Sequence, residues 1–187
     1  MTNVMIEPVV SVICEEKHET IERHVYSMTL SVENLREVWE RSKEHATLFS
    51  QEVRQDFAKF ISLFVREGKD GLEATGLFWV IDDFIGVYYL TEIMDHDALM
   101  HYSFFDGSFK GRVDLTKAMI EHVFKKFGFV RLTGICPVRA VPALAFAKRL
   151  GLSEEGRKRK AVMYKGEWND VIMFGILREE ALDGREH

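Results

Sequence analysis

The sequence predicts an α+β domain in which helices flank a mostly antiparallel sheet. Three consecutive segments rich in β-branched and aromatic residues, 74–81, 84–93 and 98–105, are separated by short polar breaks and indicate antiparallel strands. Apolar residues recur with helical spacing on both sides of these segments. The predicted order is strand, two helices, three strands, helix, strand, helix and two strands.

The first half of this order rests on helix-capping signals. A strand is expected over 24–30, and Ser31 is a suitable N-cap for a helix with Leu35, Val38 and Trp39 on one face. A second helix is expected between the N-cap Ser50 and Gly68. Its apolar face would comprise Phe57, Phe60, Ile61, Phe64 and Val65.

The second half contains two more helices. Asp114 is a suitable N-cap for a helix that Gly128 ends, and Pro142 suits the first turn of a helix that Gly151 ends. The remaining elements are strands, expected at 130–135, 158–164 and 170–177.

Composition indicates a single globular domain. The chain has 187 residues, of which 47% are apolar and 29% are charged. We expect an N-terminal arm over 1–23, the main domain over 24–180 and a C-terminal tail over 181–187. The apolar patch Val9–Cys14 in the arm could add an edge strand or pack on a partner subunit, which leaves a homodimer open.

Several function classes are disfavoured. A net charge of −5 disfavours nucleic acid as the main partner, and the basic run 157–160 is interpreted as the solvated face and turn of a hairpin. The two cysteines offer neither a disulfide framework nor zinc spacing, and Asp95-His96-Asp97 cannot converge on one ion, so no metal is expected. We find no signal segment or membrane-spanning run. The expectation is a cytoplasmic protein without a membrane partner.

The most informative segment is the strand 98–105, the loop that follows it and the helix after the loop. Backbone N–H groups at a helix N-terminus lack partners and can bind a pyrophosphate. Gly111 would allow close approach, and Lys110 and Arg112 would add positive charge. Because many strand–loop–helix units share this pattern, it is weak evidence by itself.

A wider set of residues strengthens it. The set comprises Lys110-Gly111-Arg112-Val113-Asp114-Leu115-Thr116-Lys117-Ala118, Phe124, Phe127-Gly128, Arg149-Leu150-Gly151-Leu152, Glu155-Gly156, Gly166, Asn169-Asp170 and Leu177-Arg178-Glu179-Glu180. Over about 24–180 the chain resembles the GNAT superfamily of N-acetyltransferases. Within it, the chain looks most like the branch of bacterial enzymes that acetylate ribosomal-protein N-termini.

The resemblance implies a central mixed sheet of about seven strands, splayed between the fourth and fifth strands and flanked by about four helices. Acetyl-CoA would lie in that gap and donate its acetyl group to a primary amine by direct attack. Backbone N–H groups of the fourth strand would polarise the thioester. The implied coenzyme-binding residues are Phe104, Phe105, Lys110, Gly111, Arg112, Val113, Asp114 and Leu115.

The chain departs from the family pattern at four positions. Val113 replaces the expected central glycine, and Leu115 replaces a small residue. Ala140 and Ala147 replace the asparagine and tyrosine that the family often carries. Since that tyrosine helps to protonate the leaving thiolate, solvent would have to supply the proton here. An alternative is therefore a catalytically inactive module that binds acyl-CoA or another protein.

Three residues are candidates for catalysis. His101 and Tyr102 are adjacent on the fourth strand, so only one can face the cleft. His101 could accept the amine's proton, or could be a packed or surface histidine. Glu92 could attract a cationic amine, or could be a charge at the end of a hairpin. The acceptor stays open: a peptide N-terminus, a lysine, a polyamine, an aminoglycoside or another small amine.

Overall fold

The computed structural model describes residues 7–16, 19–43, 49, 51–69, 71–105 and 111–183. Its strands are β1 Val10–Glu16, β2 Glu19–Ser27, β3 Val65–Gly68, β4 Gly71–Ala74, β5 Leu77–Ile81, β6 Gly86–Thr91, β7 Leu99–Phe104, β8 Arg131–Pro137, β9 Ser153–Tyr164 and β10 Glu167–Leu177. Its helices are α1 Val32–Lys43, α2 Gln51–Gln55, α3 Phe57–Ile61, α4 Arg112–Phe127, α5 Val141–Arg149 and α6 Arg178–Asp183.

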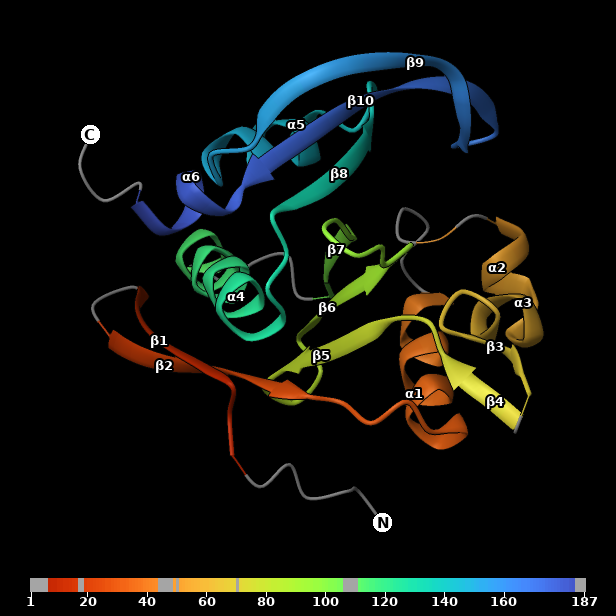
Figure 1. Cartoon of the computed structure of the whole chain (residues 1–187), viewed down its shortest axis with the longest axis horizontal. Coiled ribbons are helices and arrows are strands. Elements are labelled where there is room, and N and C mark those ends of the chain that lie inside the picture. The colour runs from red at the N-terminus through yellow and green to blue at the C-terminus, as the bar shows by residue number, and fades with distance from the viewer. Residues whose placement is uncertain are drawn as a thin grey trace.

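The described strands form one large sheet and a small hairpin. The large sheet has eight strands in the order β1-β2-β5-β6-β7-β8-β10-β9 (Figure 1), and β3 pairs with β4. Neighbouring strands of the large sheet are antiparallel except β7 and β8, which are parallel. The predicted fold class, a mixed and mostly antiparallel sheet flanked by helices, is confirmed. The patch that begins at Val9 contributes β1, so it adds an edge strand.

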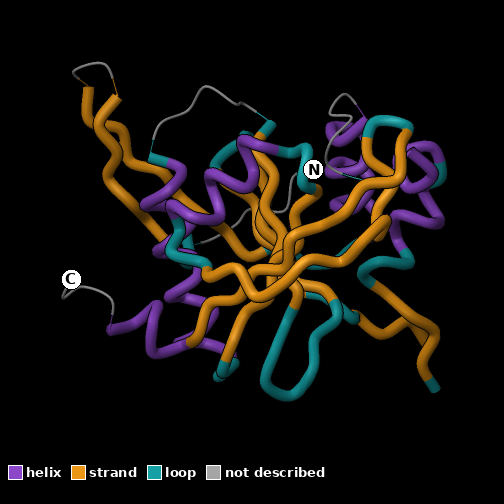
Figure 2. The backbone as a smooth tube through the Cα atoms, turned by 90° about the horizontal axis from the view of Figure 1, so that it is seen from above, coloured by secondary structure: helices purple, strands orange, loops and turns teal. Residues whose placement is uncertain are grey.

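Helices cover both faces of the sheet, as the view from above shows (Figure 2). One buried cluster joins α1 and α3 to one face of β5 and β6, through Val38, Phe60 and Tyr89 among others. A second cluster joins α4 and α5 to the opposite face, through Tyr88 and Phe146 among others. Tyr88 and Tyr89 therefore point to opposite faces, as successive strand residues must.

The second predicted helix is wrong in extent. Asp56 interrupts it with extended backbone and caps α3, because its side chain accepts hydrogen bonds from the N–H groups of Ala58 and Lys59. Val65, expected on the helix face, instead opens β3 and pairs with Ala74. Strand pairing overrides the helical spacing here. The predicted cap Ser50 lies outside the described residues.

The other helix predictions hold better. Ser31 caps α1, since its Oγ accepts from the Asn34 N–H at 3.2 Å, and Gly128 ends α4 in the left-handed conformation. The N-cap of α4 is Gly111 rather than Asp114, which lies in the first turn. No described helix is long and apolar enough to cross a bilayer.

Candidate functional site

The strands β7 and β8 meet at one end and separate beyond it. Their register contains a single pair, Leu99 with Thr133, and the Thr133 N–H donates to the Ala98 carbonyl at 3.0 Å. Beyond this point β7 continues beside β6, while β8 stays paired with β10 along its whole length (Figure 1). This divergence is the splay expected between the fourth and fifth strands.

Charged side chains fix the closed end of this gap. The Thr133 hydroxyl donates to the Asp97 carboxylate at 2.8 Å, and Arg131 Nε lies 3.4 Å from the same carboxylate. Arg131 also binds Glu155 of β9 at 2.5 Å. The three elements that meet here are therefore tied together by side chains as well as by backbone.

The backbone of β7 alternates between its two neighbours. The Phe105 N–H donates to the Ile85 carbonyl at 2.8 Å, on the β6 side. In an antiparallel ladder every second residue directs its N–H and C=O to the other side. Tyr102 and Phe104 therefore direct theirs toward β8, and Tyr102 lies where β7 no longer pairs with that strand. Of the two residues expected to pair with the coenzyme, Phe104 faces the gap and Phe105 faces β6.

The N-terminus of α4 follows the open end of β7. Gly111 is its N-cap, with φ of 75° and no side-chain cap. The amide groups of Val113 and Asp114 donate to no other described residue, as expected for a first turn without a cap. Lys110 lies outside the described residues. This end of α4 can therefore offer backbone donors and a favourable dipole to an anion.

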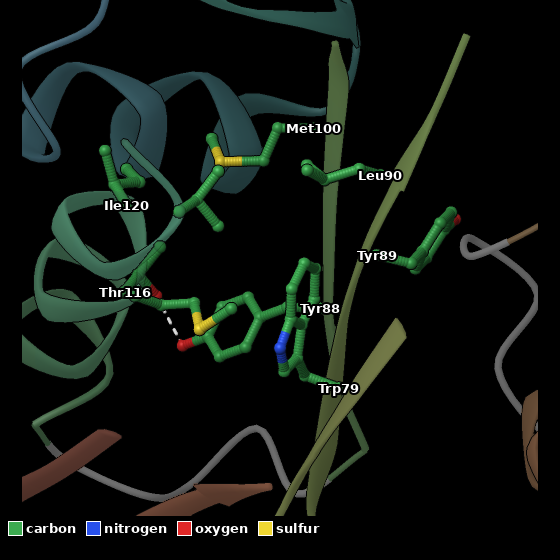
Figure 3. Close-up of a pocket in the computed structure, with 9 residues that line it drawn as sticks. Trp79, Tyr88, Tyr89, Leu90, Met100, Thr116 and Ile120 are labelled. Atoms are coloured by element: carbon green, nitrogen blue, oxygen red, sulfur yellow. Dashed lines mark hydrogen bonds between the residues drawn. The ribbon is translucent and has the colours of Figure 1, made fainter. Parts of the chain in front are cut away.

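Contacts from two other elements position this helix end. A Cβ added to Gly111 would lie 2.6 Å from Cys14 Cβ and would also overlap Cys14 Sγ, so β1 packs directly against the cap. Thr116 donates to the Arg112 carbonyl at 2.6 Å and shares a hydrogen bond of 2.8 Å with the Tyr88 hydroxyl. Both hydroxyl groups are buried beside a small apolar cavity (Figure 3), and burial raises the pKa of Tyr88. The cap is thereby held against the sheet.

The three catalytic candidates lie apart from one another. His101 faces the side of α1–α3, stacks on Tyr89 with ring centroids 4.4 Å apart, and shares a hydrogen bond of 2.8 Å with the Thr91 hydroxyl. Tyr102 faces α5 on the opposite side of the sheet. Glu92 is exposed after the end of β6, with φ of 49°. The predicted opposition of His101 and Tyr102 is confirmed.

The α5 side of the gap contains three aromatic rings, here called the aromatic triad: Tyr102, Phe104 and Phe146. The Phe146 centroid lies 4.9 Å from that of Tyr102 and 5.6 Å from that of Phe104. Ala147, where the family often carries tyrosine, is fully buried next to Phe146. Sequence reasoning missed Phe146 and the contact of Cys14 with Gly111, since neither residue belongs to a recognisable motif.

Burial lowers the pKa of His101 to about 4. The folded state therefore keeps this ring neutral at pH 7, and a group of such low pKa is a weak base. In the unfolded chain the ring binds a proton below about pH 6.5. Below that pH the unfolded chain binds a proton that the folded state does not bind. The free energy of unfolding is therefore highest above about pH 6.5 and decreases as the pH falls toward 4.

We expect His101→Gln to flatten the pH dependence of stability between pH 6.5 and 4. The lowering of the His101 pKa from 6.5 to about 4 corresponds to at most about 3–4 kcal/mol across this range. Glutamine keeps a hydrogen-bonding group but does not titrate. Urea unfolding of both proteins at pH 7, 5.5 and 4.5 measures the difference. Parallel pH curves would show that His101 does not carry this dependence.

Similarity to known proteins is low in sequence and high in fold. No family model matches this chain. The uncharacterized N-acetyltransferase YnaD of Bacillus subtilis is 28% identical over 67 residues, which are 36% of this chain and 39% of the relative. The chain thus matches well under half the length of that curated relative.

Solved structures match over most of the chain. A mutant of the spermidine N-acetyltransferase SpeG from Vibrio cholerae has a TM-score of 0.69 at 16% identity, covering 88% of this chain and 98% of that one. A dodecameric structure of the same enzyme gives 0.65 at 17% identity and the same coverage. A chimera of it with hSSAT gives 0.67 at 19% identity, covering 85% and 98%.

These matches show the fold of N-acetyltransferases, while an activity of the GNAT type and the ribosomal-protein branch stay predictions. Among the residues that the structure describes, no group of three or more histidine, cysteine or acidic side chains is placed to hold a metal ion. The identities of the structural matches are low, so they establish the architecture alone. The chain has the fold of the GNAT N-acetyltransferases.

Proposed function

We propose that this protein transfers an acetyl group from acetyl-CoA to a primary amine. The observation that carries the proposal is the separation of β7 from β8 beside a helix N-terminus without a side-chain cap. A diphosphate fits the donors of the first turn of α4. The extended arm of the coenzyme, which ends in the thioester, fits beside β7 on the side that faces β8, where Tyr102 directs its backbone N–H and C=O.

The reaction needs little from side chains. The amine nitrogen attacks the thioester carbonyl, the carbon–sulfur bond breaks, and the thiolate leaves with its electron pair. A backbone N–H of β7, for which we propose Tyr102, stabilises the negative charge that develops on the carbonyl oxygen. Because His101 has a pKa of about 4, we propose that water rather than His101 takes the amine's proton. Glu92 is proposed to attract the cationic amine before it loses that proton.

The decisive experiment is a thermal-unfolding measurement with the coenzyme. Acetyl-CoA at one hundred times its Kd should stabilise the folded state by about 2.7 kcal/mol. For a chain of this length that stabilisation raises the Tm by about 5–10 °C. ATP at the same concentration is a control for unspecific anion binding. No rise with acetyl-CoA in folded protein would overturn the proposal.

A second candidate function is a module that binds acyl-CoA without turnover. It is favoured by the aromatic triad, which occupies the α5 side of the gap, and by Ala147 in place of tyrosine. A thiol-release assay over a broad amine panel separates the two functions. The panel includes spermidine, the substrate named for the similar structures. Turnover of any amine discards the inactive module, and a coenzyme-induced rise in Tm without turnover supports it.

A further inference from the structure

The hairpin of β9 and β10 carries an unusual concentration of positive charge. Residues 156–170 hold five basic and two acidic side chains, in a chain whose net charge is −5. Four of the basic side chains are consecutive on β9, and all four are exposed: Arg157, Lys158, Arg159 and Lys160. β9 is an edge strand, and no strand in the described part of the chain pairs with its outer side.

Few carboxylates of the protein neutralise this charge. Asp170 binds Arg157 at 2.8 Å and accepts from the backbone N–H of Lys160. The described residues place no carboxylate within ion-pair distance of the Lys158, Arg159 or Lys160 side chains. Arg159 also interacts electrostatically with Asp170, so the positive charges of Lys158 and Lys160 remain available to an external anion.

The strand register connects β9 to the gap. Ile135 of β8 pairs with Met173 of β10, which pairs with Gly156 of β9. Directly paired residues share a face of the sheet. Ile135 and Met173 expose 45% and 36% of their surface, and a Cβ added at Gly156 would meet nothing within 4 Å. An open apolar row therefore crosses the sheet from the strand that borders the gap to its basic edge.

This row lies on the same face as His101. Leu99 pairs with Thr133, so alternation along β7 and β8 puts His101 and Ile135 on one side. Lys158 shares that side, because it pairs with Val171, which in turn pairs with Pro137. Two strand spacings, about 10 Å, separate the strand that borders the gap from β9. About three extended residues span that distance.

We propose that the acceptor is an acidic peptide whose N-terminal amine enters the gap and whose carboxylates bind Lys158 and Lys160. Its backbone would cross Ile135 and Met173, with acidic residues at about the fourth to sixth positions. This inference rests on the proposed acetyltransferase function, because it assigns the acceptor class of the same site. It separates this chain from the spermidine enzymes that share its fold, whose named substrate is a polycation.

Edge protection and nucleic-acid binding account less well for the basic strand. Lysines protect edge strands from unwanted pairing, but protection does not account for the exposed apolar residues Ile135 and Met173 on the face that Lys158 shares. Nucleic acid would also be attracted to the basic strand. A peptide, unlike a nucleic acid, also supplies the aliphatic primary amine that the proposed reaction consumes.

The test compares two peptides of equal length that begin with the same three residues and continue with aspartates or with lysines. We expect the acidic peptide to have a KM at least tenfold lower in 50 mM NaCl, and the difference to shrink in 300 mM NaCl. The double variant Lys158→Glu/Lys160→Glu should raise the KM for the acidic peptide about tenfold with little change in kcat. Lys125→Glu/Lys126→Glu, on exposed residues of α4 with the same change of net charge, should leave that KM unchanged.

Anisotropy with the labelled acidic peptide, measured without coenzyme, tests the surface independently of turnover. An acetyl-CoA-induced rise in Tm together with equal KM values for the two peptides, or with a lower KM for spermidine, overturns the inference and keeps the enzyme. Absence of that rise overturns the enzyme, while anisotropy still decides whether the hairpin binds acidic peptides. Salt-dependent RNA binding that the β9 variant abolishes, without any peptide preference, overturns the inference in favour of nucleic acid.

Discussion

Gly111→Ala is expected to lower the free energy of unfolding by about 3 kcal/mol and to abolish the stabilisation by acetyl-CoA. Gly111 has a φ of 75°, where a side chain costs about 1–2 kcal/mol. The added Cβ would also lie 2.6 Å from Cys14 Cβ, and overpacking of this kind costs about 1–3 kcal/mol. Relief of the overlap requires β1 and the first turn of α4 to separate, which displaces the amides of Val113 and Asp114. Urea unfolding and coenzyme-dependent melting measure the two effects.

Gly128→Ala is the matched control at the other end of the same helix. Gly128 also has a φ of 75°, but a Cβ added there would meet nothing within 4 Å. The free energy of unfolding of the control should therefore fall only by the cost of a side chain in the left-handed conformation, about 1–2 kcal/mol. Acetyl-CoA should still stabilise the control. Equal losses in the two variants would show that the contact with Cys14 does not matter. A retained response in Gly111→Ala would place the coenzyme elsewhere.

Elements with strong local signals were predictable from the sequence. Ser31 and the apolar face that follows it determine α1, and Gly128 ends α4 where its left-handed conformation is needed. The segment after Asp56 was not predictable in this way. Its phenylalanines have helical spacing, but Phe64 packs between Phe78 and Tyr89 of the sheet. That packing, together with the pairing of β3 and β4, is a tertiary effect.

The candidate site was predictable in its topology and not in its chemistry. Alternation along β7 was enough to place His101 and Tyr102 on opposite faces. The low pKa of His101 depends on burial, to which the stacked Tyr89 ring contributes, and no local pattern encodes that contact. The gap likewise follows from the strand order, but its aromatic content depends on where α5 directs Phe146. Helical spacing alone places different residues of α5 on its inward face.

Phe146→Ala is expected to destabilise the protein and yet to bind acetyl-CoA more tightly. Truncation of a buried phenylalanine costs about 3–5 kcal/mol, and Phe146 is only 8% exposed. The same ring contacts Tyr102 and Phe104, whose backbone groups point toward the gap, and we expect an entering coenzyme arm to displace it. Each aromatic pair is worth about 0.5–1.5 kcal/mol. Removing this competition should lower the Kd by about three- to tenfold, which calorimetric titration measures.

Phe129→Ala separates this effect from general loosening of the core. Phe129 is 5% exposed, belongs to the same buried cluster, and its ring contact is with Phe127 rather than with the aromatic triad. Its truncation should cost a similar free energy of unfolding and leave the Kd for acetyl-CoA unchanged. If both variants bind more tightly, flexibility of the core is the cause. If Phe146→Ala binds more weakly, the ring forms a wall of the coenzyme site and does not compete for it. A lower free energy of unfolding together with a lower Kd for acetyl-CoA, in Phe146→Ala but not in Phe129→Ala, would therefore show that the Phe146 ring occupies the path of the coenzyme.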